Sequence, residues 1–310
     1  MRVPEFQRLS ELRHKGWKNP AGDQFFEKEL QIADNADKEA AKNFFKMIKG
    51  IGHDMHRLTD VFRIHNPVLD KQRILDMRMA PGGCLGIALQ VNPKTRAIGF
   101  GLPKCEGGHN VLLLKHPTIS AKFIDITLLA ADMGWLDIPN DQSRCGEILA
   151  PSIRPGQALD LIICDGKHRE ASRLTLTHLA LGLGHTKLGG TIVILLHKVK
   201  SSHTLQLLHA ISTFSSVRLY KHPRFHAKRS LFYMLATIIW HYCSEAAVAI
   251  QGWRRMWEIA MLGTDDTFSQ AIQGNVRDID VILKNFDPRL AVLGKHIWGV
   301  QADALYSLSP

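Results

Sequence analysis

The segment Ile74-Leu75-Asp76-Met77-Arg78-Met79-Ala80-Pro81-Gly82-Gly83 decides the fold class. Ile74 to Met77 is typical of the end of a buried strand, and Ala80-Pro81-Gly82-Gly83 predicts a tight turn into a helix. Glycine lets a ligand approach the backbone closely, and the first N–H groups of a helix favour an anionic group. Asp76 falls at the carboxyl end of the strand, where open α/β sheets bind ligands. We therefore predict a ligand pocket here; the alternative is a plain strand-to-helix connection.

Short apolar, β-branched runs alternate with helical stretches on both sides of this turn. We expect strands at about 74–79, 96–101, 122–126, 161–165, 191–197, 217–220 and 231–236. Most are continuously apolar, as strands covered on both faces are, and the intervening helices imply parallel pairing. Only residues 221–230 separate the last two strands, which is too short for a helical crossover, so this pair should be antiparallel. The prediction is an α/β fold with six parallel strands and one antiparallel strand.

The flanking regions predict helices rather than further strands. Residues 1–66 form a charged helical N-terminal extension, 67–238 the sheet domain, and 239–310 a helical C-terminal extension. The C-terminal tryptophans lie among Ala, Ile and Leu, and we expect them in a core rather than in a ligand cage. These tryptophans are Trp240, Trp253, Trp257 and Trp298.

The composition is that of a basic globular protein. The 310 residues carry a formal net charge of +10, which favours a polyanionic partner such as RNA. The five cysteines are scattered without CxxC spacing, so we expect neither a disulfide framework nor a metal site. The sequence shows no secretory signal and no membrane-spanning apolar run, which predicts an intracellular protein of the cytoplasm or nucleus with no membrane partner.

Three segments resemble the FtsJ-like ribose 2′-O-methyltransferases, which act on RNA. Asp76 to Gly83 resembles their first motif, Asp160 to Gly166 their fourth strand with its catalytic aspartate, and Lys221 to Tyr233 their closing hairpin. The resemblance covers residues 67–238. It implies a Rossmann-like methyltransferase sheet, the cofactor S-adenosylmethionine (SAM) and the activity of a transferase that methylates RNA.

The resemblance also implies a Lys-Asp-Lys-Glu catalytic tetrad, which this chain keeps only in part. Asp165 matches the aspartate, with a helix N-cap as its alternative role. Lys46 is the candidate for the first lysine, although a solvated lysine on an amphipathic helix explains it equally well. Leucines, Leu195 and Leu231, stand where the second lysine and the glutamate are expected. Because leucine cannot ionise, these two positions argue against the family's mechanism.

Two residues close to the second lysine position are possible replacements. His197 lies two residues after Leu195 and keeps its face of the strand, so we list it as a candidate acid/base group. Lys198 lies three residues after Leu195 and reverses the face. The alternative is that both residues merely close the strand at the surface.

The cofactor side lacks the acidic residue that methyltransferases place after the second strand. Phe100 and Leu102 are candidates to pack against the adenine, and Asp125 is the candidate for its amino group or else a turn aspartate. Together with the first motif, the expected cofactor-binding set is Asp76, Ala80, Pro81, Gly82, Gly83, Phe100, Leu102 and Asp125.

A cluster of basic residues precedes the last strand. Lys221, Arg224, Lys228 and Arg229 are the candidate substrate-binding residues, and the interleaved Phe225 could stack on a base. The alternative is a solvated loop.

Three hypotheses of function remain open from these residues. The first is an active methyltransferase with an altered acid/base set, acting on RNA or on a small-molecule acceptor. The second is a non-catalytic SAM- or RNA-binding protein. The third is an interaction protein in which the helical extensions dominate.

Overall fold

The structure is a computed structural model that describes residues 3–17, 38–65, 72–113, 116–135, 152–153, 157–165, 171–274 and 279–307. Its centre is a seven-stranded sheet in the order β3-β2-β1-β4-β5-β7-β6. The strands are β1 (Arg73–Asp76), β2 (Arg96–Gly101), β3 (Ile119–Phe123), β4 (Leu159–Cys164), β5 (Thr186–His197), β6 (Ser216–Tyr220) and β7 (Leu231–Thr237). β7 pairs antiparallel with both β5 and β6, and the other pairs are parallel. This confirms the expected Rossmann-like methyltransferase sheet, including its antiparallel last pair.

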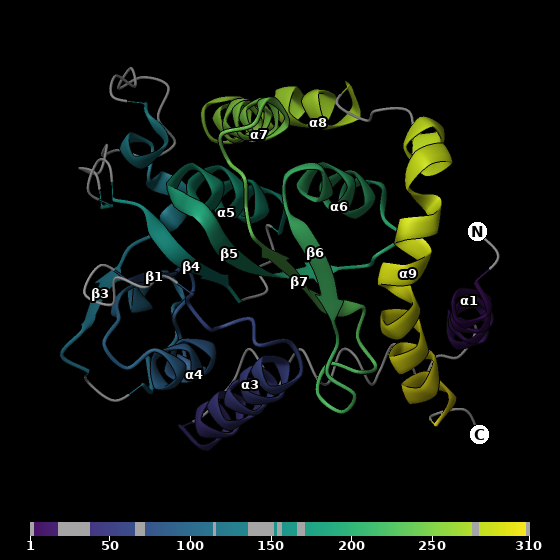
Figure 1. Cartoon of the computed structure of the whole chain (residues 1–310), viewed down its shortest axis with the longest axis horizontal. Helices are drawn as coiled ribbons and strands as arrows, with labels where there is room; N and C mark the ends of the chain where they lie inside the picture. Colours follow the sequence, from purple (N-terminus) through teal and green to yellow (C-terminus); the bar gives the residue numbers. More distant parts are fainter. Residues whose placement is uncertain are drawn as a thin grey trace.

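Helices cover both faces of the sheet (Figure 1). The helices are α1 (Pro4–Trp17), α3 (Lys38–Thr59), α4 (Gly83–Val91), α5 (Ala171–His185), α6 (Ser202–Phe214), α7 (Ser244–Leu262), α8 (Asp265–Gly274) and α9 (Ile279–Tyr306). One face packs against α3 and α4 through a cluster that includes Ile51, Leu85 and Ile163. The other face packs against α5 and α6, with α7 beyond them, through a cluster that includes Ile162 and Trp257. Alternate residues of one strand, such as Ile162 and Ile163, thus enter opposite cores.

Most strands differ by a few residues from their predicted bounds, and β5 begins five residues earlier than predicted; at β1 and β3 the difference has a clear local cause. β3 ends at Phe123, three residues earlier than expected, because the Asp125 side chain accepts a hydrogen bond from Thr127 N (2.9 Å) and begins the 3-10 turn η3 (Ile126–Leu128). β1 ends at Asp76, where the carboxylate accepts a hydrogen bond from Arg78 N (3.0 Å). In both places an aspartate carboxylate accepts a hydrogen bond from the backbone N–H two residues later, and the chain turns away from the sheet.

The two extensions pack against the sheet domain and each other. α1 lies along α9, where Arg8 pairs with Asp303 (2.6 Å) and the Phe6 ring contacts Trp298 edge-on. Trp257 and Trp298 are buried in the core as expected, whereas Trp240 is 60 % exposed, so the core expectation is wrong for Trp240. None of the helices in the described ranges carries an apolar stretch that would cross a membrane.

Candidate active site

The glycine turn after β1 is shaped by packing. Gly82 has φ 106°, a left-handed conformation that favours glycine, and a Cβ there would lie 2.8 Å from the Cβ of Leu113. A Cβ on Gly83 would lie 2.6 Å from the backbone nitrogen of Lys49 on α3. Close helix packing therefore requires a glycine at position 83, a reason that adds to the ligand approach expected from the sequence. Gly82 caps α4 without a side-chain hydrogen bond, so a ligand can cap the first turn of α4.

Charged groups gather beside this turn. Asp76 is 2 % exposed, and burial raises the pKa of its carboxyl to about 8. The guanidinium of Arg78 lies in the field of Asp165, Asp76 and Asp125, and its Nη1 is buried with no hydrogen-bond partner among the described residues. A buried donor without an acceptor is costly, so Arg78 is suited to hold an anionic ligand group.

Asp165 follows β4 at the same edge of the sheet. Its Oδ1 accepts a hydrogen bond from the Tyr233 hydroxyl (2.9 Å), and its Oδ2 accepts one from the Cys84 thiol (3.1 Å). Burial raises the pKa of the Asp165 carboxyl, and the two hydrogen bonds and Arg78 oppose this rise. The carboxylate is thus oriented by donors from α4 and β7, and it is a stronger base than an exposed aspartate.

His178 on α5 lies close enough to Arg78 to feel its charge. It is 3 % exposed, and burial, followed by the charge of Arg78, lowers the pKa of its imidazole to about 3. Its Nε2 has no hydrogen-bond partner among the described residues. The imidazole is therefore neutral and has one ring nitrogen ready for a ligand.

The sequence analysis missed four side chains of this site. Arg78 and Tyr233 stood inside quoted motifs without an assigned role, and Cys84 directly follows the glycine pair. His178 carries no motif signal. Its position one helical turn before Gly182, which packs on Met77 of the β1 turn, becomes visible only when α5 lies on the sheet.

The structure places the other predicted catalytic residues less centrally. Lys46 is exposed on α3. His197 ends β5 and is exposed, and Lys198 follows it with φ 52° and donates its backbone N–H to Ser230 O (2.9 Å). Leu195 lies opposite Tyr233 in the β5–β7 register, and Leu231 lies opposite His197. Apolar side chains therefore flank the contact between Tyr233 and Asp165.

The predicted adenine contacts have mixed placements. Phe100 is fully buried in the core cluster that contains Leu75 and Leu129, so its ring packs in the core and is not available to an adenine. Leu102 follows β2 and is half-buried. Asp125 uses its Oδ1 for both the backbone and the hydroxyl of Thr127, which is the turn role that we left open.

The predicted RNA-binding role of Lys221 is wrong in this structure. The side chain is 1 % exposed, and its ammonium donates to the carbonyl oxygens of His226 (2.9 Å), Arg229 (2.6 Å) and Leu231 (2.7 Å). Burial lowers the pKa of Lys221 to about 7. Lys221 thus holds the β6–β7 connection together. Arg224 is exposed, and Lys228 and Arg229 are half-buried.

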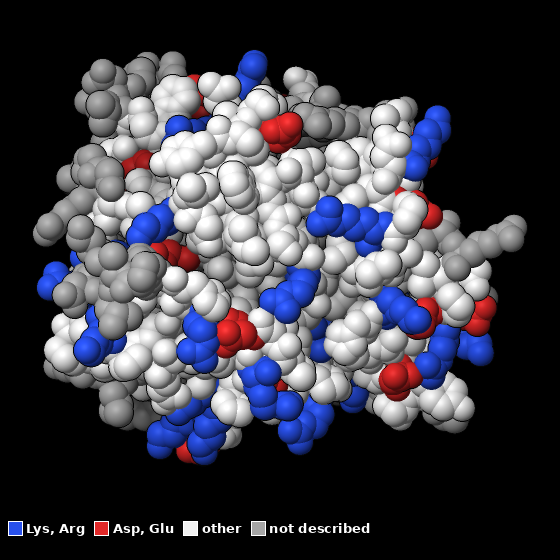
Figure 2. All heavy atoms as spheres, viewed as in Figure 1, with Lys and Arg blue, Asp and Glu red and all other residues white. Residues whose placement is uncertain are grey.

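Exposed basic side chains also run along α3. Lys42, Lys46, Lys49 and Arg57 are exposed and recur at helical spacing, and Figure 2 shows Lys and Arg side chains gathered along the lower edge, over α3. Asp54 of the same helix binds His222 of the β6–β7 connection (Nε2 to Oδ2, 3.2 Å). We call Lys42, Lys46, Lys49 and Arg57 the α3 basic stripe. Together with Arg224 they form one charged surface.

Within the described ranges, no three His, Cys, Asp or Glu side chains are grouped so that they could hold a metal ion.

No family model and no curated protein matches the sequence. Partial matches among solved structures include an O-methyltransferase family protein from Burkholderia thailandensis, with 13 % identity over 74 % of this chain and 71 % of that chain and a TM-score of 0.39. An rRNA methylase from Streptococcus thermophilus matches at 12 % identity over 60 % and 96 % of the two chains, with a TM-score of 0.39. Human methyltransferase-like protein 13 in complex with SAH matches at 10 % identity over 72 % and 99 %, with a TM-score of 0.41. These scores are low, and the fold assignment depends on the strand order and directions given above.

Proposed function

We propose that this chain is a SAM-dependent methyltransferase that acts on RNA and uses Asp165 as its base. The hydrogen bond between Cys84 and Asp165 carries this proposal, because Cys84 lies in the first turn of α4 and Asp165 at the end of β4. This hydrogen bond brings the glycine turn, here called the cofactor turn, and Asp165 together at one edge of the sheet, where open α/β folds bind ligands.

The residues at the turn fit the amino-acid end of SAM. The first turn of α4 lacks a side-chain cap, and the unpartnered Nη1 of Arg78 is a second donor for a carboxylate. At the other end of the cofactor, Asp125 remains our candidate for the adenine amino group through its second carboxylate oxygen. When bound, SAM supplies a methyl group made electrophilic by its sulfonium.

Asp165 would hold the acceptor hydroxyl or amine and take up the proton that it releases. Tyr233 and Cys84 fix the direction of the carboxylate, and its raised pKa strengthens it as a base. Because Leu195 and Leu231 cannot assist, the reaction depends on one carboxylate rather than on a lysine set. Ribose methylation remains the expectation from the FtsJ-like resemblance, and these two leucines argue for a different acceptor atom.

The α3 basic stripe and Arg224 support RNA as the acceptor. Cations at helical spacing follow the phosphates of a strand, and Phe225 beside Arg224 offers a ring for stacking. The wall of the glycine turn on this side is α3 itself, through the contact of Gly83 with Lys49.

Two measurements test this function. Calorimetric titration with SAM and with its demethylated product should give saturable binding. Transfer of labelled methyl from SAM to total RNA should fall about 10²–10⁴-fold in Asp165→Asn, with SAM affinity nearly unchanged. The matched control Asp266→Asn changes an exposed aspartate on α8 and should be neutral.

Undiminished transfer in Asp165→Asn would show that the site is misplaced. SAM binding without transfer to RNA or to small-molecule acceptors would favour the second candidate, a non-catalytic SAM- or RNA-binding pseudo-methyltransferase. The replacement of two tetrad positions by Leu195 and Leu231 is the observation behind that candidate.

A further inference from the structure

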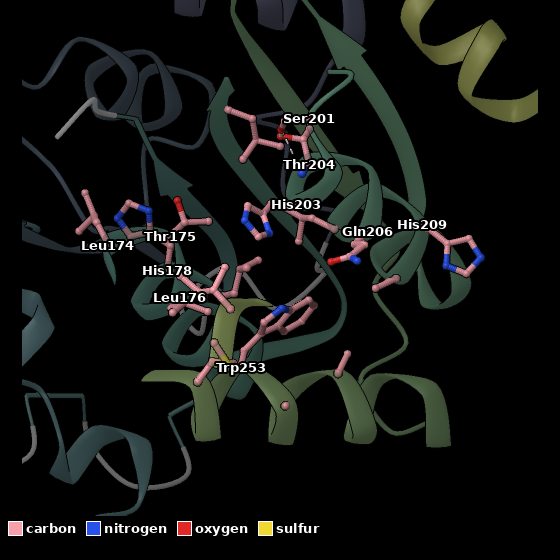
Figure 3. A pocket seen from close by; sticks show the side chains of 18 of the residues that line it. Leu174, Thr175, Leu176, His178, Ser201, His203, Thr204, Gln206, His209 and Trp253 are labelled. Carbon is pink, nitrogen blue, oxygen red and sulfur yellow. Dashed lines mark hydrogen bonds between the residues drawn. The ribbon is translucent and has the colours of Figure 1, made fainter. Parts of the chain in front are cut away.

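A cavity of about 710 Å³ lies between α5 and α6 and beneath α7. Figure 3 shows side chains of α5, including His178, and of α6, including His203, lining this space, with Trp253 of α7 below them. Phe268 of α8 and Ile282 of α9 complete the lining. The walls thus come from five helices and from the ends of β5 and β7, and not from the glycine turn or α4 in the described chain.

The lining is mainly apolar and carries almost no formal charge. Leucines of α5, α6 and the two strands contribute to the apolar wall, and Glu245 is the one carboxylate among the described lining residues, with no lysine or arginine beside it. Pockets for small molecules have this volume and this composition, in which a few polar groups orient a mostly apolar ligand. An anionic ligand would find no lysine or arginine among the described lining residues to pair with it.

The polar group that marks the cavity as a ligand site is His178. Its side chain is 97 % buried, since 3 % is exposed, and its Nε2 has no hydrogen-bond partner among the described residues. Buried polar atoms in folded proteins are nearly always paired, so an orphan in a cavity wall indicates a partner that is not part of the chain.

The C-terminal helices create this space. Without α7 and α8, the groove between α5 and α6 would be open to solvent. The helices cover the groove without filling it, and the covered volume is large enough for a molecule of two or three rings.

We propose that the cavity binds a small, uncharged, mainly aromatic or aliphatic molecule with one hydroxyl or amine group that hydrogen-bonds Nε2 of His178. No described residue of the glycine turn or of α4 lines the cavity, and the proposal does not depend on methyltransferase activity.

The first test uses N-phenyl-1-naphthylamine, an uncharged fluorescent probe, with the full-length protein. Its emission should rise saturably at one site and quench Trp253, which lines the cavity. Ala249→Trp places a large ring in the cavity from α7 and should weaken probe binding at least about tenfold. The control Ala247→Trp makes the same change on the same helix at an exposed residue outside the lining, and should leave binding unchanged.

Thermal unfolding checks that each variant is folded. Should Ala249→Trp fail to fold, Ala210→Phe blocks the same cavity from α6 on the opposite wall and takes its place. The proposal is overturned by non-saturable probe binding to the wild-type protein, or by wild-type affinity in a folded cavity-filling variant.

The second test isolates the hydrogen bond to His178. 4-Phenylphenol and 4-methylbiphenyl have nearly the same shape but differ by a hydroxyl, and both can displace the probe. We expect the phenol to compete about tenfold better with wild-type protein, and the preference to drop below about twofold in His178→Leu. An unchanged preference in His178→Leu would remove His178 from the site. Titration with SAM reports separately on the cofactor turn, so failure of either proposal can be recognised.

Discussion

The two faces of the sheet differ in how closely their helices approach. On the α3 and α4 side, a Cβ on Gly83 would collide with the backbone of α3 at 2.6 Å. On the α5 to α8 side, a Cβ on Gly184 of α5 would lie 2.9 Å from Nη2 of Arg254 on α7, but a Cβ on Gly252 of α7 would meet nothing within 4 Å, and Gly252 lines the cavity. The first side carries exposed cations on α3, whereas the second contains a mainly apolar cavity. The edge of the sheet at which the parallel strands end, with Asp76 and Asp165, therefore lies between two different binding environments.

Substitutions of Gly83 and Gly252 test the difference in packing between the two faces and should have the largest effect. Gly83→Ala should destabilise the protein by about 2–3 kcal/mol, because the added methyl must displace the backbone of α3. Gly252→Ala should instead stabilise it by about 0.5–1 kcal/mol, since α7 gains helix propensity and the methyl has room. Urea unfolding of both variants measures the difference. Equal effects would show that the two sides are equally packed.

The buried aspartate at the shared edge should make stability depend on pH. The raised pKa of Asp76, about 8, means that the folded state binds more protons than the unfolded state between pH 4 and 8. Stability contributed by the neutral carboxyl is therefore present at low pH and lost as pH rises toward 8. Asp76→Asn should remove this slope and gain on the order of 2 kcal/mol at pH 8 relative to wild type. Denaturant unfolding from pH 5 to 8 measures it, and an unchanged slope in Asp76→Asn would contradict the assignment.

Substitutions in the α3 basic stripe test the difference in charge between the two sides. Replacing Lys42, Lys46 and Lys49 by Gln should weaken binding of single-stranded RNA about tenfold at 0.1 M salt and reduce the salt slope by about 2. The matched control replaces three exposed basic residues of α9, Lys284, Arg289 and Lys295, by Gln. Filter binding at several salt concentrations tests this. An equal loss in both variants would mean that RNA responds only to net charge.

Tyr233 should have the smallest effect of the four. Tyr233→Phe removes a hydrogen bond that lowers the pKa of Asp165, so the acidic limb of the pH–rate profile should move to higher pH. We expect a rate loss of about three- to tenfold at neutral pH, because the carboxylate keeps its bond from Cys84. A lower rate with an unmoved acidic limb would indicate a purely structural role for the tyrosine.

The strand pattern could be predicted because buried strands and their connections follow local rules. Apolar runs, glycine turns and the short connection before Leu231 yielded the seven strands, their directions and an acidic carboxyl edge. Asp125 shows the limit of this reasoning, because its side chain caps a turn and β3 ends three residues earlier than predicted.

The rest of the site required the packed chain. Tyr233 meets Asp165 across 68 residues, and only the folded chain shows that Nη1 of Arg78 is buried without a hydrogen-bond partner among the described residues. Lys221 stood in a basic cluster, yet the connection folds its carbonyls around the ammonium and buries it. The cavity depends on how α7 lies over α5 and α6, and no local signal describes a space between helices.

Gly83 has a mechanical consequence beyond the turn that it forms. A Cβ on Gly83 would lie 2.6 Å from the backbone nitrogen of Lys49 and 2.7 Å from Cγ2 of Ile48, so α3 and the start of α4 approach each other closely at this point. A small displacement of the first turn of α4 is therefore transmitted to α3 and its cations with little loss. The absence of one methyl group thus allows the turn and the helix that carries the charged surface to pack directly against each other.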